Sequence, residues 1–377
     1  MFTRSRKRYI GTSTSNRNVE IEAWISEVPL VEPLRIAPGT SYTQRSIIIR
    51  LRDGDLEGWG EACQSRRVLG ETMEDALASL KKIIPAIKKA SYESIEAIHE
   101  FTEGLDATPS IKAALNIALL DMYSKSEKRP LWKLLGGYRE SLVTDITIGI
   151  MEPEEMAQKA LKFAERGFSI FKLKLGENAE KDIDRVKKVR DALGEGPTIR
   201  VDANEGWRYE DAVRVVNRIA DYEVELVEQP LRHDLLHELK MLRRESPIPI
   251  ALDESVRTPG EALRAVEEDA ADIINIKLMK SRGITPAIRI IAISETAGVK
   301  NMVGCFSETR LGITATAYLA QAYRNVYYYD LDCDILSIDP VFRGGSEPEG
   351  PVRRPSQGYG LGVTLSNEGH LRPTKIV

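Results

Sequence analysis

Apolar and polar residues alternate over the first patterned stretch of the chain, which predicts a small antiparallel sheet. The apolar face of its first strand is formed by Val19, Ile21, Ala23 and Ile25. Two further β-rich runs, 46–51 and 56–61, flank Asp53-Gly54, a dipeptide typical of tight hairpin turns. Apolar residues then recur every three or four positions over 72–89, 92–104 and 109–126, which predicts helices. We therefore expect residues 19–140 to form one α+β unit.

The pattern changes near residue 140, after which short β-rich runs alternate with amphipathic stretches. The β-rich runs lie at 143–149, 169–175, 198–203, 224–228, 248–252, 272–276, 300–305 and 326–330. One intervening stretch, 153–166, has the helical period and ends before Gly167. Parallel strands need a crossover helix between them, so this rhythm predicts an α/β barrel of the TIM type over residues 141–335.

The composition narrows the classes of function that such a fold can serve. The chain has 53 basic and 57 acidic residues, which disfavours a nucleic-acid binder, and no apolar run reaches the ~18 residues of a membrane span. Residues 1–18 contain basic residues but no acid, and we interpret them as a basic tail. The three cysteines are far apart and form no CxxC pair. This argues against a disulfide framework or a cysteine zinc site, and favours a reducing cytoplasm.

One polar residue closes each β-rich run, and successive residues of this kind are about 25 positions apart, the length of one barrel unit. They are Thr147, Lys174, Asp202, Glu228, Asp253, Lys277, Cys305 and Asp330. The active sites of such barrels lie at the carboxyl ends of the strands. We therefore expect these side chains to meet at one mouth of the barrel.

Three consecutive members of this series are acids, and they predict a metal site. Asp202, Glu228 and Asp253 each follow an apolar run, so their carboxylates repel one another unless a cation joins them. Oxygen ligands favour Mg²⁺, or Mn²⁺, over zinc. By this reasoning an Asp253→Asn protein folds, because the lost charge relieves repulsion. The alternative is that each acid caps a helix or pairs with a lysine.

Lysines flank the acids on the second and sixth predicted strands, at opposite sides of the mouth. A lysine acts as a base only when it is partly neutral, and Lys172 supplies positive charge close to Lys174. A base on each face of one carbon is what a racemase or epimerase needs, with a metal to stabilise the enediolate formed next to a carboxylate. Two alternatives are that Lys174 and Lys277 only neutralise the acids, or that one forms a Schiff base.

These residues carry a family resemblance that runs from about residue 19 to 377. The motifs are Lys172-Leu173-Lys174, Asp202-Ala203-Asn204, Glu228-Gln229-Pro230, Asp253-Glu254-Ser255 and Asn275-Ile276-Lys277-Leu278-Met279-Lys280. They resemble the enolase superfamily, in particular its muconate lactonizing enzyme subgroup, whose bases include lysines that work with Mg²⁺. The resemblance implies a modified (β/α)₇β barrel and a capping domain to which residues 336–377 return. No histidine occurs in 303–309, which disfavours the mandelate racemase type.

The eighth predicted strand ends in Asp330-Leu331-Asp332, which resembles dipeptide epimerases, where such a pair holds the substrate's ammonium group. The resemblance implies a Mg²⁺-dependent epimerase that inverts the α-carbon of the C-terminal residue of a dipeptide, with Thr147 and Cys305 also at the substrate. Other activities of the subgroup remain alternatives: N-acylamino acid racemase, o-succinylbenzoate synthase and muconate cycloisomerase. A non-catalytic dipeptide-binding protein is the alternative outside enzymes. We expect a cytoplasmic homo-oligomer that binds a dipeptide as its substrate. We expect it to bind neither nucleic acid nor a membrane.

One departure bears on specificity. L-Ala-D/L-Glu epimerases of this group grip the glutamate side chain with an arginine in a cap loop, and Gly39 stands in its place here. Arg35, Arg66 or Arg67 could replace it. We expect residues 34–42 and 63–70 to form mobile lid loops, and a preference for dipeptides other than Ala-Glu.

Overall fold

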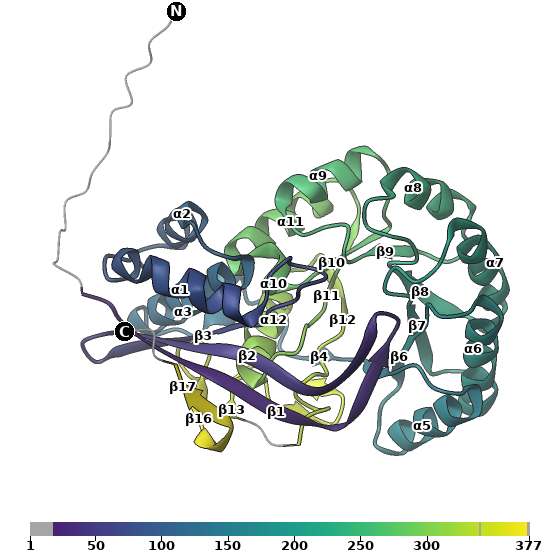
Figure 1. Cartoon of the computed structure of the whole chain (residues 1–377), viewed down its shortest axis with the longest axis horizontal. Coiled ribbons are helices and arrows are strands. Elements are labelled where there is room, and N and C mark those ends of the chain that lie inside the picture. The colour runs from purple at the N-terminus through teal and green to yellow at the C-terminus, as the bar shows by residue number, and fades with distance from the viewer. Residues whose placement is uncertain (1–17, 339–340, 375–377) are drawn as a thin grey trace, which may run out of the picture.

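The computed structural model describes residues 18–338 and 341–374. Residues 1–17 of the predicted basic tail lie outside the described residues. Figure 1 shows two parts, a cap of sheet and helices and a barrel ringed by helices. One apolar core extends through both parts, and α12 (Arg310–Ala322) is buried along its whole length.

The cap begins with an antiparallel sheet. Its strands are β1 (Glu20–Ile36), β2 (Gly39–Asp53) and β3 (Leu56–Ala62). The helices that follow are α1 (Met73–Ile87), α2 (Ile95–Gly104), α3 (Pro109–Ser126) and the short α4 (Leu131–Leu135). The side chain of Thr72 caps α1, and Pro109 begins α3. Gly60 allows β3 to approach α3, because a Cβ there would lie 1.9 Å from the carbonyl oxygen of Ala114.

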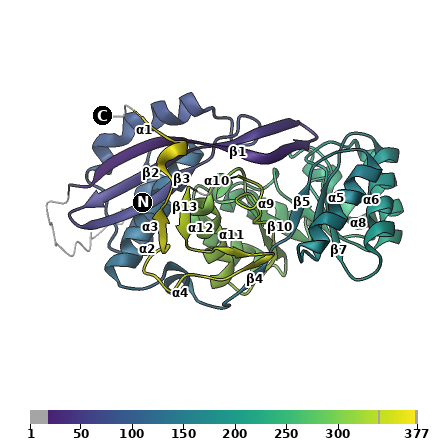
Figure 2. The same cartoon turned by 90° about the horizontal axis from the view of Figure 1, so that it is seen from below.

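The first two strands extend much further than predicted, and the expected lid loop at 34–42 is instead the tip of their hairpin. Ile36 pairs with Gly39, and the register shifts between Pro29 and Leu34. The alternation that predicts a strand is absent from this arm because most of its residues lie outside the core. Figures 1 and 2 show the arm running from the cap to the barrel, where Ile150 N–H donates to the carbonyl oxygen of Arg35 at 2.7 Å.

The barrel contains eight parallel strands joined in sequence order, which confirms the predicted fold class. The strands are β5 (Ile146–Ile148), β6 (Ile170–Lys174), β7 (Thr198–Asp202), β8 (Val224–Glu228), β9 (Ile250–Leu252), β10 (Ile273–Ile276), β11 (Lys300–Val303) and β12 (Val326–Tyr329). The N–H of Asp145 donates to the carbonyl oxygen of Tyr329 at 3.2 Å, so the edge strands β5 and β12 meet. Seven helical crossovers link eight strands, as a (β/α)₇β barrel requires.

Helices cover the outside of this barrel (Figure 1). They are α5 (Pro153–Glu165), α6 (Ala179–Leu193), α7 (Tyr209–Ile219) with the 3₁₀ turn η1 (Ala220–Tyr222), α8 (Leu236–Glu245), α9 (Pro259–Glu267), α10 (Leu278–Ser281) and α11 (Ile284–Thr296), besides α12. No helix among the described residues is long and apolar enough to cross a membrane.

The C-terminal segment returns to the cap. Its elements are β13 (Phe342–Gly344), β14 (Pro348–Glu349), β15 (Val352–Arg353), β16 (Val363–Leu365), η2 (Glu368–His370) and β17 (Leu371–Pro373). The last of these, β17, pairs antiparallel with β1, while β15 pairs with β4 (Leu142–Val143) just before the barrel. The cap sheet is thus completed by residues from the end of the chain.

Candidate active site

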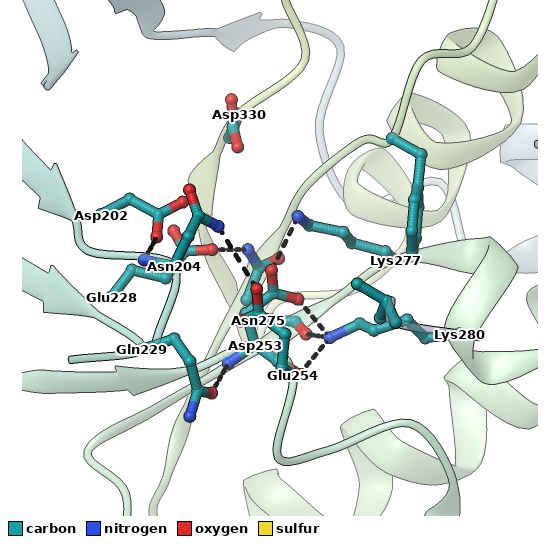
Figure 3. A network of polar contacts seen from close by, with 12 residues as sticks. Asp202, Asn204, Glu228, Gln229, Asp253, Glu254, Asn275, Lys277, Lys280 and Asp330 are labelled. Carbon is teal, nitrogen blue, oxygen red and sulfur yellow. Dashed lines mark hydrogen bonds and ion pairs between the residues drawn. The ribbon is translucent and has the colours of Figure 1, made fainter. Parts of the chain in front are cut away.

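The polar residues predicted at the strand ends lie at one mouth of the barrel. Lys174 and Asp202 are register partners, and so are Asp202 and Glu228. Asp253 and Lys277 directly follow β9 and β10. Figure 3 shows these acids and Lys277 pointing toward one another from their separate strands. The regular spacing in the sequence is therefore a convergence in space.

The three acids predicted to bind metal are buried, and their ionisation differs. Burial raises the pKa of Asp202, but the charges of Lys174 and Lys172 lower it to about 2. Asp253 behaves in the same way, with Lys277 and Lys280 holding its pKa well below the usual range. Burial and the neighbouring charge of Asp202 raise the pKa of Glu228. Glu228 is therefore the acid whose charge most needs another cation.

Lys172 lies at the centre of the acidic group and is fully enclosed. Its Nζ lies 2.7 Å from Asp330 Oδ2, 2.6 Å from Glu228 Oε2 and 3.2 Å from Asp202 Oδ2. Burial lowers its pKa, but these charges raise it well above the usual value. Lys172 is therefore a fixed cation that holds three carboxylates together. The alternative that Lys174 and Lys277 only neutralise the acids stays open, because each of them also pairs with one acid.

Lys174 and Lys277 differ from Lys172 because both line a cavity of about 280 Å³. Lys174 Nζ lies 2.6 Å from Asp202 Oδ2, and Lys277 Nζ lies 2.8 Å from Asp253 Oδ2 and over the ring of Phe306. Their strands β6 and β10 are four apart in an eight-stranded barrel, so the two amines approach the cavity from opposite sides. Each amine can therefore reach one face of a bound molecule.

Sequence reasoning gave no role to Lys280 and Asn275, which organise the acids from behind. Lys280 Nζ lies 2.5 Å from Asp253 Oδ1 and 2.9 Å from the carbonyl oxygen of Asn275, and it is buried. The Nδ2 of Asn275 donates to Glu228 Oε1 at 2.7 Å. The available signal was position, since Asn275 precedes Lys277 by two residues and shares its side of the strand end.

These contacts overturn the prediction that Asp253→Asn relieves repulsion. Asp253 pairs with both Lys277 and Lys280. Removing its charge leaves two buried ammonium groups with less compensation, and breaking a buried pair costs about 3–5 kcal/mol. We now expect this variant to lose stability rather than gain it, which thermal unfolding of the Asp253→Asn and parent proteins measures. An unchanged or raised Tm would contradict the contact geometry.

Asp330 and Asp332, the predicted ammonium site, are both buried beside β5. Asp330 accepts from Lys172, whereas Asp332 Oδ2 accepts the backbone N–H of Thr147 at 2.6 Å. Burial and the charge of Asp330 raise the pKa of Asp332 to about 6. One oxygen each of Asp145, Asp330 and Asp332 lie within 4.8 Å of one another, so Asp145, which sequence reasoning missed, adds to this acidic group. Its position before a short strand carried no signal.

The cap closes the cavity with polar side chains (Ser41, Gln44, Gln64, Ser65 and Arg67) and with apolar ones from the hairpin arm and the second cap loop. The apolar ones include Leu30, Leu34, Ile36 and Val68. Two of the arginines considered as replacements at Gly39 are held in ion pairs. Arg67 contacts Glu205 and Glu254 at 2.5 and 2.6 Å, and Arg35 contacts Glu177 at 2.5 Å. The arginines therefore face acids of the protein itself.

All three cysteines are free, as expected from the absence of a disulfide framework, but two of them lie together. Cys305 and Cys333 are 28 residues apart, yet their Sγ atoms are 2.8 Å apart. They are close because they follow β11 and β12, which are neighbours in the sheet. Sequence distance was therefore a poor guide to whether these thiols form a site.

Comparisons with known proteins agree with this geometry. The family model "Mandelate racemase / muconate lactonizing enzyme, N-terminal domain" matches residues 20–136, and "Enolase C-terminal domain-like" matches residues 155–369. The chain is 39% identical to a hydrophobic dipeptide epimerase of Enterococcus faecalis over 92% of this chain and 99% of that protein. It is 38% identical to the L-Ala-D/L-Glu epimerase of Bacillus subtilis, over 92% and 96% respectively. A crystal structure of the dipeptide epimerase from E. faecalis V583 with Mg and L-Leu-L-Tyr superposes with a TM-score of 0.88 at 38% identity, covering 92% of this chain and 99% of that one.

Proposed function

The chain belongs to the mandelate racemase and muconate lactonizing enzyme family of the enolase superfamily, as its motifs predicted, and we propose that it is a Mg²⁺-dependent dipeptide epimerase. The observation that carries the proposal is the placement of Lys174 and Lys277 on opposite sides of one cavity, beside three buried carboxylates. Its relatives support the class of reaction, since those compared above are epimerases.

Asp202, Glu228 and Asp253 suit a magnesium ion by their chemistry, and they point toward one another at one mouth of the barrel, although their ligand atoms do not all lie within 4.8 Å of one another. All three offer carboxylate oxygens, the donors that Mg²⁺ prefers, and lysine amines now compensate their charges. The raised pKa of Glu228, which burial and the charge of Asp202 cause, supports a further cation beside it. When bound, Mg²⁺ supplies the positive charge that offsets the additional negative charge of a carboxylate whose α-proton has been removed.

The two lysines at the cavity would carry out the proton transfers. One of Lys174 and Lys277 takes the α-proton of the C-terminal residue, and the other delivers a proton to the opposite face of the enediolate. The roles exchange for the other enantiomer. Lys172, which is enclosed and paired with three acids, holds Asp202, Glu228 and Asp330 in place and takes no proton. Positions fixed in advance by such contacts lower the cost of reaching the transition state.

The ammonium group of the dipeptide would bind at Asp332, with Asp330 beside it. Asp330 already compensates Lys172, whereas the raised pKa of Asp332 indicates a carboxylate that lacks a cation. A positive charge at this point removes the electrostatic penalty that raises the pKa. Thr147 contributes by fixing Asp332 through its backbone N–H.

This assignment predicts an acid limb in the pH profile. Asp332 must be ionised to hold an ammonium group, and its pKa of about 6 means that it gains a proton as the pH falls through that value. At about pH 5 roughly a tenth remains ionised, so kcat/KM should fall about tenfold from its neutral value while kcat, which reports the filled site, falls less. Initial rates across pH at saturating Mg²⁺ measure this. A flat kcat/KM down to pH 5 would contradict the role of Asp332.

The apolar side chains of the cap, together with the pairing of Arg67, favour hydrophobic dipeptides over Ala-Glu. A glutamate side chain would meet Leu34, Ile36 and Val68 and would find Arg67 already paired with two acids. A missing charge-assisted contact costs about 1.5–3 kcal/mol, so L-Ala-L-Leu should exceed L-Ala-L-Glu in kcat/KM by about 10- to 100-fold. A panel of L-Ala-Xaa and Xaa-L-Leu dipeptides tests this. A strong preference for Ala-Glu that is lost in Arg67→Ala or Arg66→Ala would show that the cap does supply a cation.

Adding N-acetylated amino acids to this panel distinguishes a dipeptide epimerase from an N-acylamino acid racemase. An N-acetylated amino acid lacks the ammonium group, so it should be a poor substrate if Asp332 acts as proposed. Equal turnover of N-acylated amino acids and dipeptides would favour the N-acylamino acid racemase alternative. A cytoplasmic location and assembly into a homo-oligomer stay predictions, and light scattering of the purified protein measures the second.

A further inference from the structure

The two cysteines at the cavity form a feature that the proposed epimerisation does not require. Cys305 and Cys333 both line the cavity of about 280 Å³ that contains the two lysines. Their Sγ atoms are in contact at 2.8 Å. Proton transfer by Lys174 and Lys277 uses neither sulfur. The proposed proton transfers therefore leave this pair of thiols at the cavity without a role.

A third ligand atom lies beside the sulfurs. Asp332 Oδ1 is 4.0 Å from Cys305 Sγ, and its other oxygen is fixed by Thr147. One ligand atom each of Cys305, Asp332 and Cys333 lie within 4.8 Å of one another. Two thiolates on one tetrahedral zinc, with Zn–S bonds of about 2.3 Å, are about 3.8 Å apart, so the sulfurs need to separate by only about 1 Å.

The charges around the thiols favour a cation over oxidation. Contact with Cys333 lowers the pKa of Cys305, but burial and the charges of Asp330 and Asp332 raise it to about 11. The thiol form therefore dominates at neutral pH, and thiols react slowly with oxidants. A divalent metal displaces a thiol proton outright, and the same acids attract it. Mg²⁺ prefers oxygen ligands, so it competes poorly for the sulfurs.

We propose that Cys305, Cys333 and Asp332 form a second metal site, specific for a thiophilic divalent cation such as Zn²⁺, and that the bound cation inhibits turnover by occupying Asp332. Binding releases one proton from each of the two thiols and engages the carboxylate, without any change of oxidation state. The metal binding is independent of the proposed reaction, whereas the inhibition rests on the role of Asp332 as the ammonium site.

Titration of the reduced protein with Cd²⁺, at saturating Mg²⁺, tests the binding directly through the ultraviolet thiolate-to-metal charge-transfer absorption. The absorption should appear in the parent protein and in Cys63→Ser, the matched control at the third cysteine. It should be lost in Cys305→Ser and Cys333→Ser. Absence of the absorption in the parent, or its persistence in Cys333→Ser, would overturn the site. Loss of two thiols in air within the time of the titration would overturn it in favour of a disulfide.

Inhibition by Zn²⁺ forms the second part of the test. Zn²⁺ at the concentration that saturates the site should lower kcat/KM at least about tenfold in the parent and in Cys63→Ser, with rising dipeptide concentration restoring the rate. In Cys333→Ser, the same concentration of Zn²⁺ should leave kcat/KM close to the value that this variant has without zinc. Metal binding without inhibition would overturn the inhibitory role. Metal binding in a protein that epimerises no dipeptide would instead overturn the proposed function and leave the metal site standing.

Discussion

Removal of divalent metal is expected to abolish epimerisation, and added Mg²⁺ to restore it. An α-proton beside an uncompensated carboxylate is far too weakly acidic for a lysine base, so turnover without metal should fall below detection. Dialysis against a chelator, followed by titration with Mg²⁺ and measurement of the initial rate, provides the test. Full activity after exhaustive chelation would refute a metal-dependent reaction.

Glu228→Gln is the variant that separates metal binding from folding. Burial and the charge of Asp202 raise the pKa of the Glu228 carboxylate, so replacing it with a neutral amide removes a costly charge. The Nδ2 of Asn275 can still donate to the oxygen of that amide. Glu228 also pairs with Lys172 at 2.6 Å, but Lys172 keeps Asp202 and Asp330 as partners, so the Tm should fall less than in Asp253→Asn. The folded protein should bind Mg²⁺ weakly by calorimetry and be inactive. Asp253→Asn is less suitable because its carboxylate pairs with two lysines. Parent-like Mg²⁺ affinity in Glu228→Gln would remove this residue from the metal site.

Lys174→Ala and Lys277→Ala are each expected to lower epimerisation between about a hundredfold and ten-thousandfold, the range associated with loss of a general acid or base. Each variant keeps one lysine, so each should still exchange the α-proton of one enantiomer, and the two variants should act on opposite enantiomers. Each variant is incubated in deuterated water with the L,L dipeptide and, separately, with the L,D dipeptide. Mass spectrometry then measures the exchange of the α-proton and the extent of epimerisation.

Two controls distinguish chemistry from structure in these variants. Lys181→Ala removes an exposed lysine that pairs with Glu152 on the surface, and its activity should match the parent. Lys172→Ala removes a buried cation shared by three carboxylates, so it should lower Tm as well as activity without selecting one enantiomer. Epimerisation at the parent rate in either Lys174→Ala or Lys277→Ala would exclude the two-base mechanism.

Much of the barrel follows from local sequence because its strands are buried on both faces. In such strands the first polar residue after an apolar run marks the mouth, which is why the amino-acid pattern alone places Asp202, Glu228 and Asp253 there. Their consecutive order made a shared cation the simplest explanation. The series also placed Lys174 and Lys277 on opposite sides, since strands four apart face each other in a barrel of eight.

Contacts that depend on packing could not be predicted in this way. The hairpin arm lacks the alternation of a strand because few of its residues reach the core, so residues 34–42 were expected to form a loop. Lys280 lies in a short helix after β10, and nothing local indicates that its amine turns back to Asp253. Cys305 and Cys333 meet only because two neighbouring strands end together.

The most direct test of the two-base epimerase is the position of deuterium after partial reaction of L-Ala-L-Leu in deuterated water. If Lys174 and Lys277 serve opposite faces, the L,D product should carry deuterium at the α-carbon from the first turnovers, while the remaining L,L substrate keeps its hydrogen. At low conversion the two diastereomers are separated by chromatography, and mass spectrometry measures the deuterium content of each. Equal deuterium in substrate and product from the start would indicate a single base. An L,D product that keeps its α-hydrogen would mean that the reaction does not exchange this proton with solvent, which contradicts the two-base mechanism.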